Sequence, residues 1–391
     1  MRVSPSTITQ PPPAETSPAV TALVEQEPAQ SADAGLEVMR GTTDAFKEAL
    51  RWGPDDGSEP DRPRLLPTDN ILLADTVGDP KKVTGPSPGA AKGALADAKA
   101  LALLSPKAQL GYVQQLRQKN PAAFEALVTA LRDGTVSDKK IALAVSIELA
   151  ASTPWGKSGE GKAVLGQVRT MFEQGKVAFG KVPGNNLGFT KPDKASDGAI
   201  GGKGTGSVMT LSEGLAGTPE GLASVLAHEG VHALQYAKGK TPLSALESET
   251  AGNLVGARVW AEFGSQKEPV ADKAAAGALR TIKDDAAVFD IKQPASVNQR
   301  RMELNVATEY AYSHAKAHTK SRYAEAGGMI EHILQRPDIK DVLKEASDSQ
   351  IKRLFFAYET FIKALPPDTL ASDADLNLKT LAEEVDRRHL R

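Results

Sequence analysis

The stretch Pro219–Lys238, PEGLASVLAHEGVHALQYAK, carries the start and stop signals of a single helix. Thr218 precedes it as a suitable N-cap, and Pro219 lies in the first turn, where a missing backbone N–H leaves no hydrogen bond unmade. Gly239 follows the last periodic residue as a helix stop. We therefore expect one helix here and place the other segments relative to it.

This helix contains the pattern H-E-x-x-H at His228, Glu229 and His232. The two histidines are one turn apart on the same face, so they can share a metal ion at about 2.0–2.1 Å from each ring nitrogen. Glu229 lies about 100° further around, where a carboxylate can take a proton from a metal-bound water without being a ligand. The alternative is an ordinary helix with two satisfied polar histidines. By composition alone, such a motif arises in roughly one chain in a hundred or fewer.

A second helical segment follows over residues 242–263, after a short GKT turn that favours an antiparallel pair. Glu247 and Glu249 both lie in its early turns, but they are two residues apart and point to different faces, so only one can be a third ligand. We expect Glu249, because Asn253 follows one turn later and its amide oxygen can hold the second N–H of a ligand histidine. Glu247 is the reserve candidate.

Together these residues resemble the gluzincin group of zincin zinc metallopeptidases, in which two histidines of H-E-x-x-H and a downstream glutamate bind zinc. The resemblance covers roughly residues 160–265. It implies a Zn²⁺ cofactor held by His228, His232 and Glu249, with Glu229 as general base and a peptide or protein as substrate. At Asn253, members of the group often carry aspartate.

The amino-acid composition limits the binding partners and the metal ligands that this chain can have. The chain has 391 residues, which is long enough for two domains, and a formal net charge of −2, so there is no global electrostatic case for nucleic-acid or membrane binding. It has no cysteine, which excludes disulfides and thiolate ligands; a zinc site must therefore use histidine and carboxylate. No apolar run of membrane-spanning length occurs, so we expect no membrane span.

Residues 1–34 form a leader rich in Ser, Thr, Pro and Gln, with Arg2 as its one basic residue. Such a segment cannot bury enough apolar surface to fold, and we expect it to be disordered. It lacks the layout of a cleaved secretory signal and resembles the uncleaved export signal of type III secreted effectors. That resemblance implies secretion into a host cell and a secretion chaperone that binds the N-terminal region. The alternative is a flexible tail on a cytoplasmic protein.

The remaining segments predict an α+β fold that is mostly α. Residues 35–89 combine one helix with a proline-rich linker, and 90–155 read as a helical bundle. Residues 156–265 form the expected zincin-like core, and 266–391 form a C-terminal helical region. Within the core, short apolar or alternating runs predict the strands of a small sheet: Lys176–Val182, Leu187–Thr190 and Val208–Leu211. By the resemblance, the strand Ser207–Leu211 would be the sheet edge against which a substrate pairs.

The long helix expected over Val297–Lys320 carries candidates for stabilising the oxyanion that forms when water attacks a carbonyl. They are His314, Tyr310 and Tyr312, and the sequence does not choose among them. His314 and His318 are four residues apart, but we interpret them as a partly exposed pair, because no matching carboxylate accompanies them.

The predicted chemistry is zinc-assisted hydrolysis of a peptide bond. The alternative is a non-catalytic helical interaction or effector protein with a structural or vestigial metal site. A third hypothesis is a zinc hydrolase that acts on a cell-wall peptide.

Overall fold

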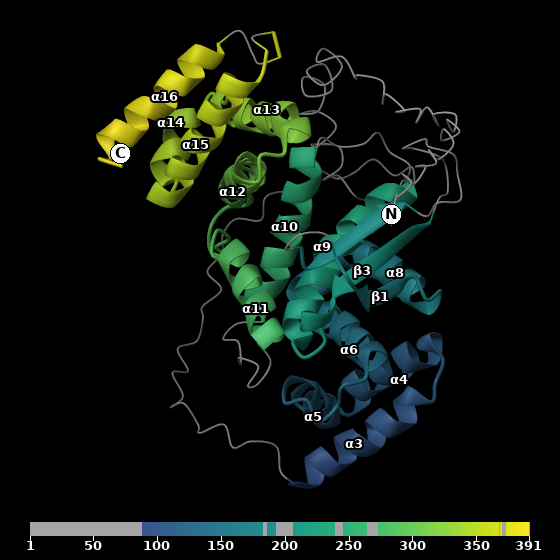
Figure 1. Ribbon diagram of the computed structural model, residues 1–391. Coiled ribbons are helices and arrows are strands. Elements are labelled where there is room, and N and C mark those ends of the chain that lie inside the picture. The colour runs from purple at the N-terminus through teal and green to yellow at the C-terminus, as the bar shows by residue number, and fades with distance from the viewer. Residues whose placement is uncertain are drawn as a thin grey trace, which may run out of the picture.

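The computed structural model describes residues 88–182, 186–192, 206–238, 245–263, 273–366, 368–369 and 373–390 (Figure 1). Most of the described residues are helical and three short strands form one sheet, so the fold is α+β and mostly α, as the sequence predicts. The leader 1–34, and nearly all of the segment 35–89 expected to hold a helix and a linker, lie outside the described residues.

Helices precede the sheet in the described part of the chain. They are α3 (Pro88–Ala102), α4 (Pro106–Lys119), α5 (Pro121–Arg132), α6 (Lys139–Ser152), the short α7 (Pro154–Lys157) and α8 (Gly159–Glu173). Glu148 of α6 is 1% exposed and accepts hydrogen bonds from Arg117 Nε at 3.0 Å and Arg169 Nη2 at 2.7 Å. Because α4, α6 and α8 each supply one of these side chains, the buried carboxylate joins three helices, and removing either arginine would leave its charge less well compensated.

The sheet consists of β1 (Val177–Gly180), β2 (Gly188–Pro192) and β3 (Ser207–Ser212), so all three predicted strands are confirmed. Their order is β1-β3-β2, with β3 parallel to β1 and antiparallel to β2. The expectation that Ser207–Leu211 forms an edge is therefore wrong, because β3 is hydrogen-bonded on both sides. β2 pairs with β3 on the side opposite β1, so β1 and β2 are the edges of the described sheet.

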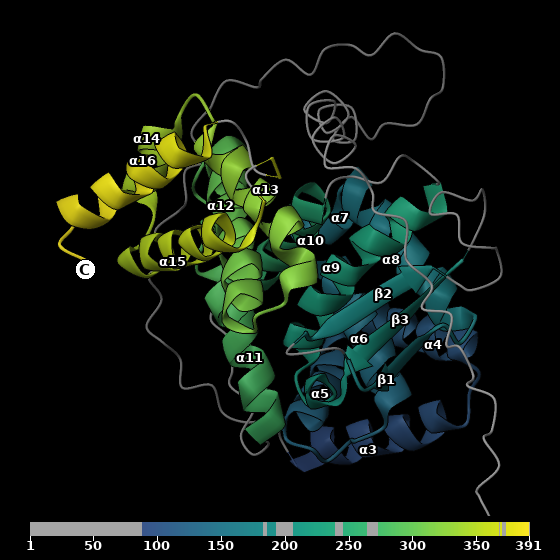
Figure 2. The same ribbon diagram turned by 45° about the horizontal axis from the view of Figure 1, so that its top comes forward.

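Two helices at the centre of the molecule carry the H-E-x-x-H motif and its partner, α9 (Pro219–Lys238) and α10 (Ala245–Glu262) (Figures 1 and 2). The residues that contact each other run in opposite directions along the two helices. Ser224 donates to the Gly256 carbonyl at 2.9 Å, the His228 ring lies against Gly252, and His232 pairs with Ser248 at 3.1 Å. Each step of four residues along α9 is matched by four residues backwards along α10, so the helices are antiparallel and in register.

The C-terminal region, residues 266–391, is mostly helical in its described part. It contains α11 (Lys273–Ala286), α12 (Ala295–Lys316), α13 (Tyr323–Leu334), α14 (Ile339–Glu345), α15 (Asp348–Ala364) and α16 (Ala374–Arg387). Helix α12 packs against both α10 and α15, so it links this region to the central helix pair (Figure 2).

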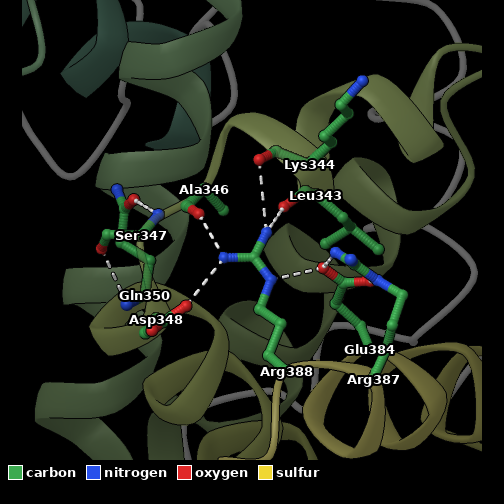
Figure 3. Close-up of polar contacts among 9 residues, drawn as sticks. All are labelled: Leu343, Lys344, Ala346, Ser347, Asp348, Gln350, Glu384, Arg387 and Arg388. Carbon is green, nitrogen blue, oxygen red and sulfur yellow. Dashed lines mark hydrogen bonds and ion pairs between the residues drawn. The ribbon is translucent and has the colours of Figure 1, made fainter.

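Arg388 lies directly after α16. Its hydrogen bonds connect this end of the described chain to the junction of α14 and α15 (Figure 3). Its guanidinium donates to Glu384 Oε1 at 2.5 Å, Ala346 O at 2.7 Å, Asp348 Oδ1 at 3.0 Å, Leu343 O at 2.5 Å and Lys344 O at 3.3 Å. Three of these acceptors are carbonyls at the C-terminal end of α14 and its C-cap, where the helix itself supplies too few N–H partners. All five N–H donors of the arginine are therefore used.

Replacing Arg388 should destabilise this corner of the molecule. We expect Arg388→Gln to lower the free energy of unfolding by about 2 kcal/mol, because several hydrogen bonds to a partly buried cationic group are lost together. Arg387→Gln is the matched control, since the Arg387 side chain is 60% exposed and its hydrogen bonds to the residues that the structure describes all go to Glu384. Urea unfolding of both variants measures the difference, and equal midpoints for the two would contradict this account of Arg388.

Candidate metal centre

His228 and His232 of α9 and Glu249 of α10 meet in one group. The two Nε2 atoms are 3.1 Å apart, and the Glu249 carboxylate lies 3.6 Å from His228 Nε2 and 3.8 Å from His232 Nε2. All the ligand atoms lie within 4.8 Å of one another, so these three side chains could hold a metal ion. No second group of three such residues occurs in the part of the chain that the structure describes.

The spacing of the two histidine nitrogens fits zinc. Tetrahedral zinc with bonds of about 2.0–2.1 Å separates its ligand atoms by about 3.3 Å. The 3.1 Å between the two Nε2 atoms is close to that value, and the contacts of 3.6 Å to His228 and 3.8 Å to His232 are made by Oε2 and Oε1 of Glu249, respectively. Two imidazoles and one carboxylate are also a common donor set of catalytic zinc sites, and they leave one of four positions for water or substrate.

A chain of hydrogen bonds fixes which nitrogen of His232 carries its proton. Ser248 Oγ donates to Gln235 Oε1 at 2.8 Å, and the same oxygen lies 3.1 Å from His232 Nδ1. Since the hydroxyl proton points to Gln235, the Ser248 oxygen accepts the N–H of Nδ1. The Nε2 lone pair of His232 is then directed at the metal position, which is the tautomer that a ligand needs.

His228 is held against the backbone of α10. A Cβ atom at Gly252 would lie 2.9 Å from Cε1 of the His228 ring, so only glycine allows this approach. The Gly252 backbone also accepts a hydrogen bond from the ring. Burial, together with the nearby His232, lowers the pKa of His228 to about 3, so the ring is neutral near pH 7 and can donate a lone pair to a cation.

Glu229 lies beside the metal group in a different environment. It is 4% exposed, and its Oε2 accepts a hydrogen bond of 2.7 Å from Thr190 Oγ1 on β2. Gly188 of the same strand is so close that a Cβ there would lie 2.6 Å from Oε1 of Glu229. Burial raises the pKa of Glu229, against the opposing effects of His232 and Thr190. A carboxylate with a raised pKa is suited to exchanging protons near neutral pH.

The groups that hydrogen-bond the histidine ring nitrogens facing away from the metal position differ from the one expected. Asn253 Nδ2 donates to the Glu249 main-chain carbonyl at 2.9 Å, and Ser248 and Gly252 take the role that the sequence analysis gave to Asn253. The reason is helical phase, because Ser248 and Gly252 are one turn apart on the face of α10 that meets α9, and Asn253 is about 100° further around. Glu247, the reserve ligand, is not a member of the metal group.

Of the three oxyanion candidates on α12, Tyr312 faces away from the metal group. Its ring is 5.8 Å from that of Phe356 on α15. Tyr310 stacks edge-on with His314 at a centroid distance of 4.4 Å. The pKa of Tyr310 is raised by burial, by its hydrogen bond with Glu325 and, to a smaller extent, by the charge of Glu249. Tyr310 is therefore the candidate whose surroundings include a member of the metal group.

Tyr236 is a further residue near the metal group, and it was not predicted from the sequence. It lies on α9 one turn after His232, and its pKa is raised by burial and by the carboxylates of Glu249 and Glu229. The spacing H-E-x-x-H-x-x-x-Y, which continues the histidine face by one more turn, was a signal that could have revealed it.

No protein-family model, curated protein or solved structure matches this chain. Among the described helices, none has both the length and the apolar character to cross a membrane. The class that fold and site define is thus a mostly helical α+β protein with a His-His-Glu group able to hold a metal ion.

The assignment of Glu249 over Glu247 can be tested by metal binding. We expect the purified chain to bind one Zn²⁺, and Glu249→Gln to weaken its affinity by about 100-fold or more, since even the loss of an outer partner typically costs 10–100-fold. The control Glu247→Gln should bind as the parent does. Competition with a chromophoric chelator measures all three affinities, and equal affinity for the two variants would reject Glu249 as a ligand.

Proposed function

We propose that this protein is a zinc-dependent peptidase of the gluzincin type, with a zincin-like core that binds Zn²⁺ through His228, His232 and Glu249. The observation that carries the proposal is the group of ligand atoms within 4.8 Å of one another. Next to it in the chain, Glu229 is buried and its pKa is raised. A metal site with a proton acceptor beside it provides the groups that hydrolysis of a peptide or protein substrate requires.

Zinc, when bound, supplies Lewis acidity and lowers the pKa of a coordinated water to about 7. Glu229 takes the proton of the attacking water and then delivers it to the leaving amine. Thr190 holds Oε2 of Glu229 from β2, so the carboxylate has one fixed orientation. Tyr236 and Tyr310 keep their protons because their pKa values are raised, and a neutral phenol can donate a hydrogen bond to the oxyanion.

The exposure of Glu249 favours a catalytic over a structural metal site. Structural zinc sites are closed by four protein ligands, whereas catalytic sites keep an accessible position. Here three protein ligands are present, and the side chain of Glu249 is 43% exposed. The competing proposal is a helical interaction protein with a structural or vestigial metal. It would be supported by stoichiometric zinc without hydrolysis that depends on Glu229.

The export proposal is separate from the enzymatic one. Residues 1–34 lie outside the described residues, so secretion as a type III effector, and binding of a secretion chaperone to the N-terminal region, rest on composition. A protein substrate in a host cell would follow from that route. The enzymatic proposal does not depend on it.

Replacing the proposed general base is the main test. We expect Glu229→Gln to retain zinc and lose about 10²–10⁴-fold in kcat, because general acid–base groups typically contribute that factor. The glutamine oxygen can still accept from Thr190, so the fold should persist. New protein N-termini in lysates treated with parent or variant identify substrates, and turnover is then measured on one of them. Equal turnover by parent and variant would end the peptidase proposal.

The close approach of β2 gives a second test that leaves every chemical group in place. We expect Gly188→Ala to lower kcat about tenfold or more while zinc affinity is unchanged, because its methyl group would overlap the Glu229 carboxylate and displace it. Gly166→Ala on α8 is the matched control, since no atom lies within 4 Å of a Cβ there. Full activity of Gly188→Ala would show that the position of this carboxylate does not limit the rate.

A further inference from the structure

A second site lies in the C-terminal helical region. A cavity of about 820 Å³ is bounded by α12, α14, α15 and the end of α11. That volume is within the usual range for small-molecule sites. Its walls carry three arginines, Arg300, Arg301 and Arg353, with serine and amide side chains between them. None of the proposed metal ligands lines it.

Arg300 and Arg301 differ from Arg353 in their hydrogen bonding. Arg353 donates to Glu309, and its guanidinium also lies 5.2 Å from the centre of the Tyr312 ring. Arg300 and Arg301, in contrast, form no hydrogen bond through their guanidinium groups with any residue that the structure describes. Their contacts are ion pairs of 3.5–3.6 Å, and Nε of Arg300 is buried without a hydrogen-bond partner.

The neighbouring carboxylates do not provide hydrogen-bond acceptors for all the N–H groups of Arg300 and Arg301. Glu345 is shared, with one oxygen 3.6 Å from Arg300 and the other 3.5 Å from Arg301. Asp338, the second partner of Arg300, is already hydrogen-bonded to Arg336 at 2.9 Å. Two guanidinium groups therefore face the cavity with most of their donors unused. A planar donor fork of this kind matches the oxygen atoms of a phosphate.

The start of α15 contributes the hydroxyl groups of Ser347 and Ser349 to the same wall. Ser347, Ser349 and Gln350 line the cavity, and they belong to the first turn of a 17-residue helix and its N-cap. Ser347 and Gln350 form a capping box there (Figure 3). The N-terminal end of a helix favours an anion. Opposite charges are also present, because Asp284, Glu309 and Glu345 line the cavity too. Asp284 and Glu309 would favour a ligand that carries hydroxyl donors besides its anionic group.

We propose that this cavity binds a small phosphorylated molecule, with the phosphate held by Arg300 and Arg301 and hydroxyl groups directed at the acidic side chains. The chemistry requires an oxyanion at one end and hydrogen-bond donors at the other. It is independent of the proposed peptidase activity, and either can hold without the other.

Calorimetric titration of the full chain with glucose 6-phosphate, inorganic phosphate and glucose tests this. We expect glucose 6-phosphate to bind more tightly than phosphate, and glucose not to bind. Arg300→Gln/Arg301→Gln should weaken binding about tenfold or more, because charge-assisted hydrogen bonds are lost. Arg280→Gln, an exposed arginine of α11 outside the cavity, should bind as the parent does. Arg301→Gln alone decides the matter if the double variant does not fold.

Phosphate also binds divalent metals, so each titration is repeated after treatment with a chelator. Binding that disappears with the metal would overturn the proposal, as would binding that is equal in the parent and in the arginine variants. The absence of any heat with both phosphates at millimolar concentration would overturn it as well. Binding of phosphate and glucose 6-phosphate with equal affinity would remove the role assigned to the acidic side chains.

Discussion

The antiparallel register of α9 and α10 is the constraint on which the candidate site depends. Ser224, His228 and His232 meet α10 at successive turns, and α10 presents Gly256, Gly252 and Ser248 to them in reverse order. Helices in contact can share ligands only if their side chains meet at matching heights. The same register that seats His228 on a glycine brings Glu249 within 3.8 Å of both histidines, so helix packing and ligand geometry have a single cause.

Much of this centre could be predicted from local sequence because its parts are helical. Pro219, the H-E-x-x-H spacing and a short turn before Pro242 define two helices and the faces they share, and these are nearest-neighbour properties of the chain. Asn253 shows the limit of that reasoning. Which face of α10 meets α9 depends on where small residues permit close approach, and only the packed structure shows that Gly252 and Gly256 define it.

The contribution of β2 could not be predicted in the same way. Gly188 and Thr190 contact a residue some forty positions later in the chain, and the run that contains them predicts a strand but not its neighbour. Sheet order depends on long-range pairing, so the strand directly before α9 was given the edge that β2 occupies. The cavity near Arg300 is harder still, because its walls come from four helices of the C-terminal region and their packing is marked by no motif.

Burial of Glu229 links the stability of the fold to the metal. Because the folded-state pKa of Glu229 lies above its ordinary value of 4.5, ionising this carboxylate costs more in the folded chain than in the unfolded one. Its contribution to the stability of the metal-free protein therefore decreases as pH rises from about 4.5 through the folded-state pKa. A divalent cation beside His228 favours the charged form and reverses that effect. Metal binding and ionisation of Glu229 thus stabilise each other, so a carboxylate that is unfavourable in the empty fold becomes a favourable neighbour of the loaded site.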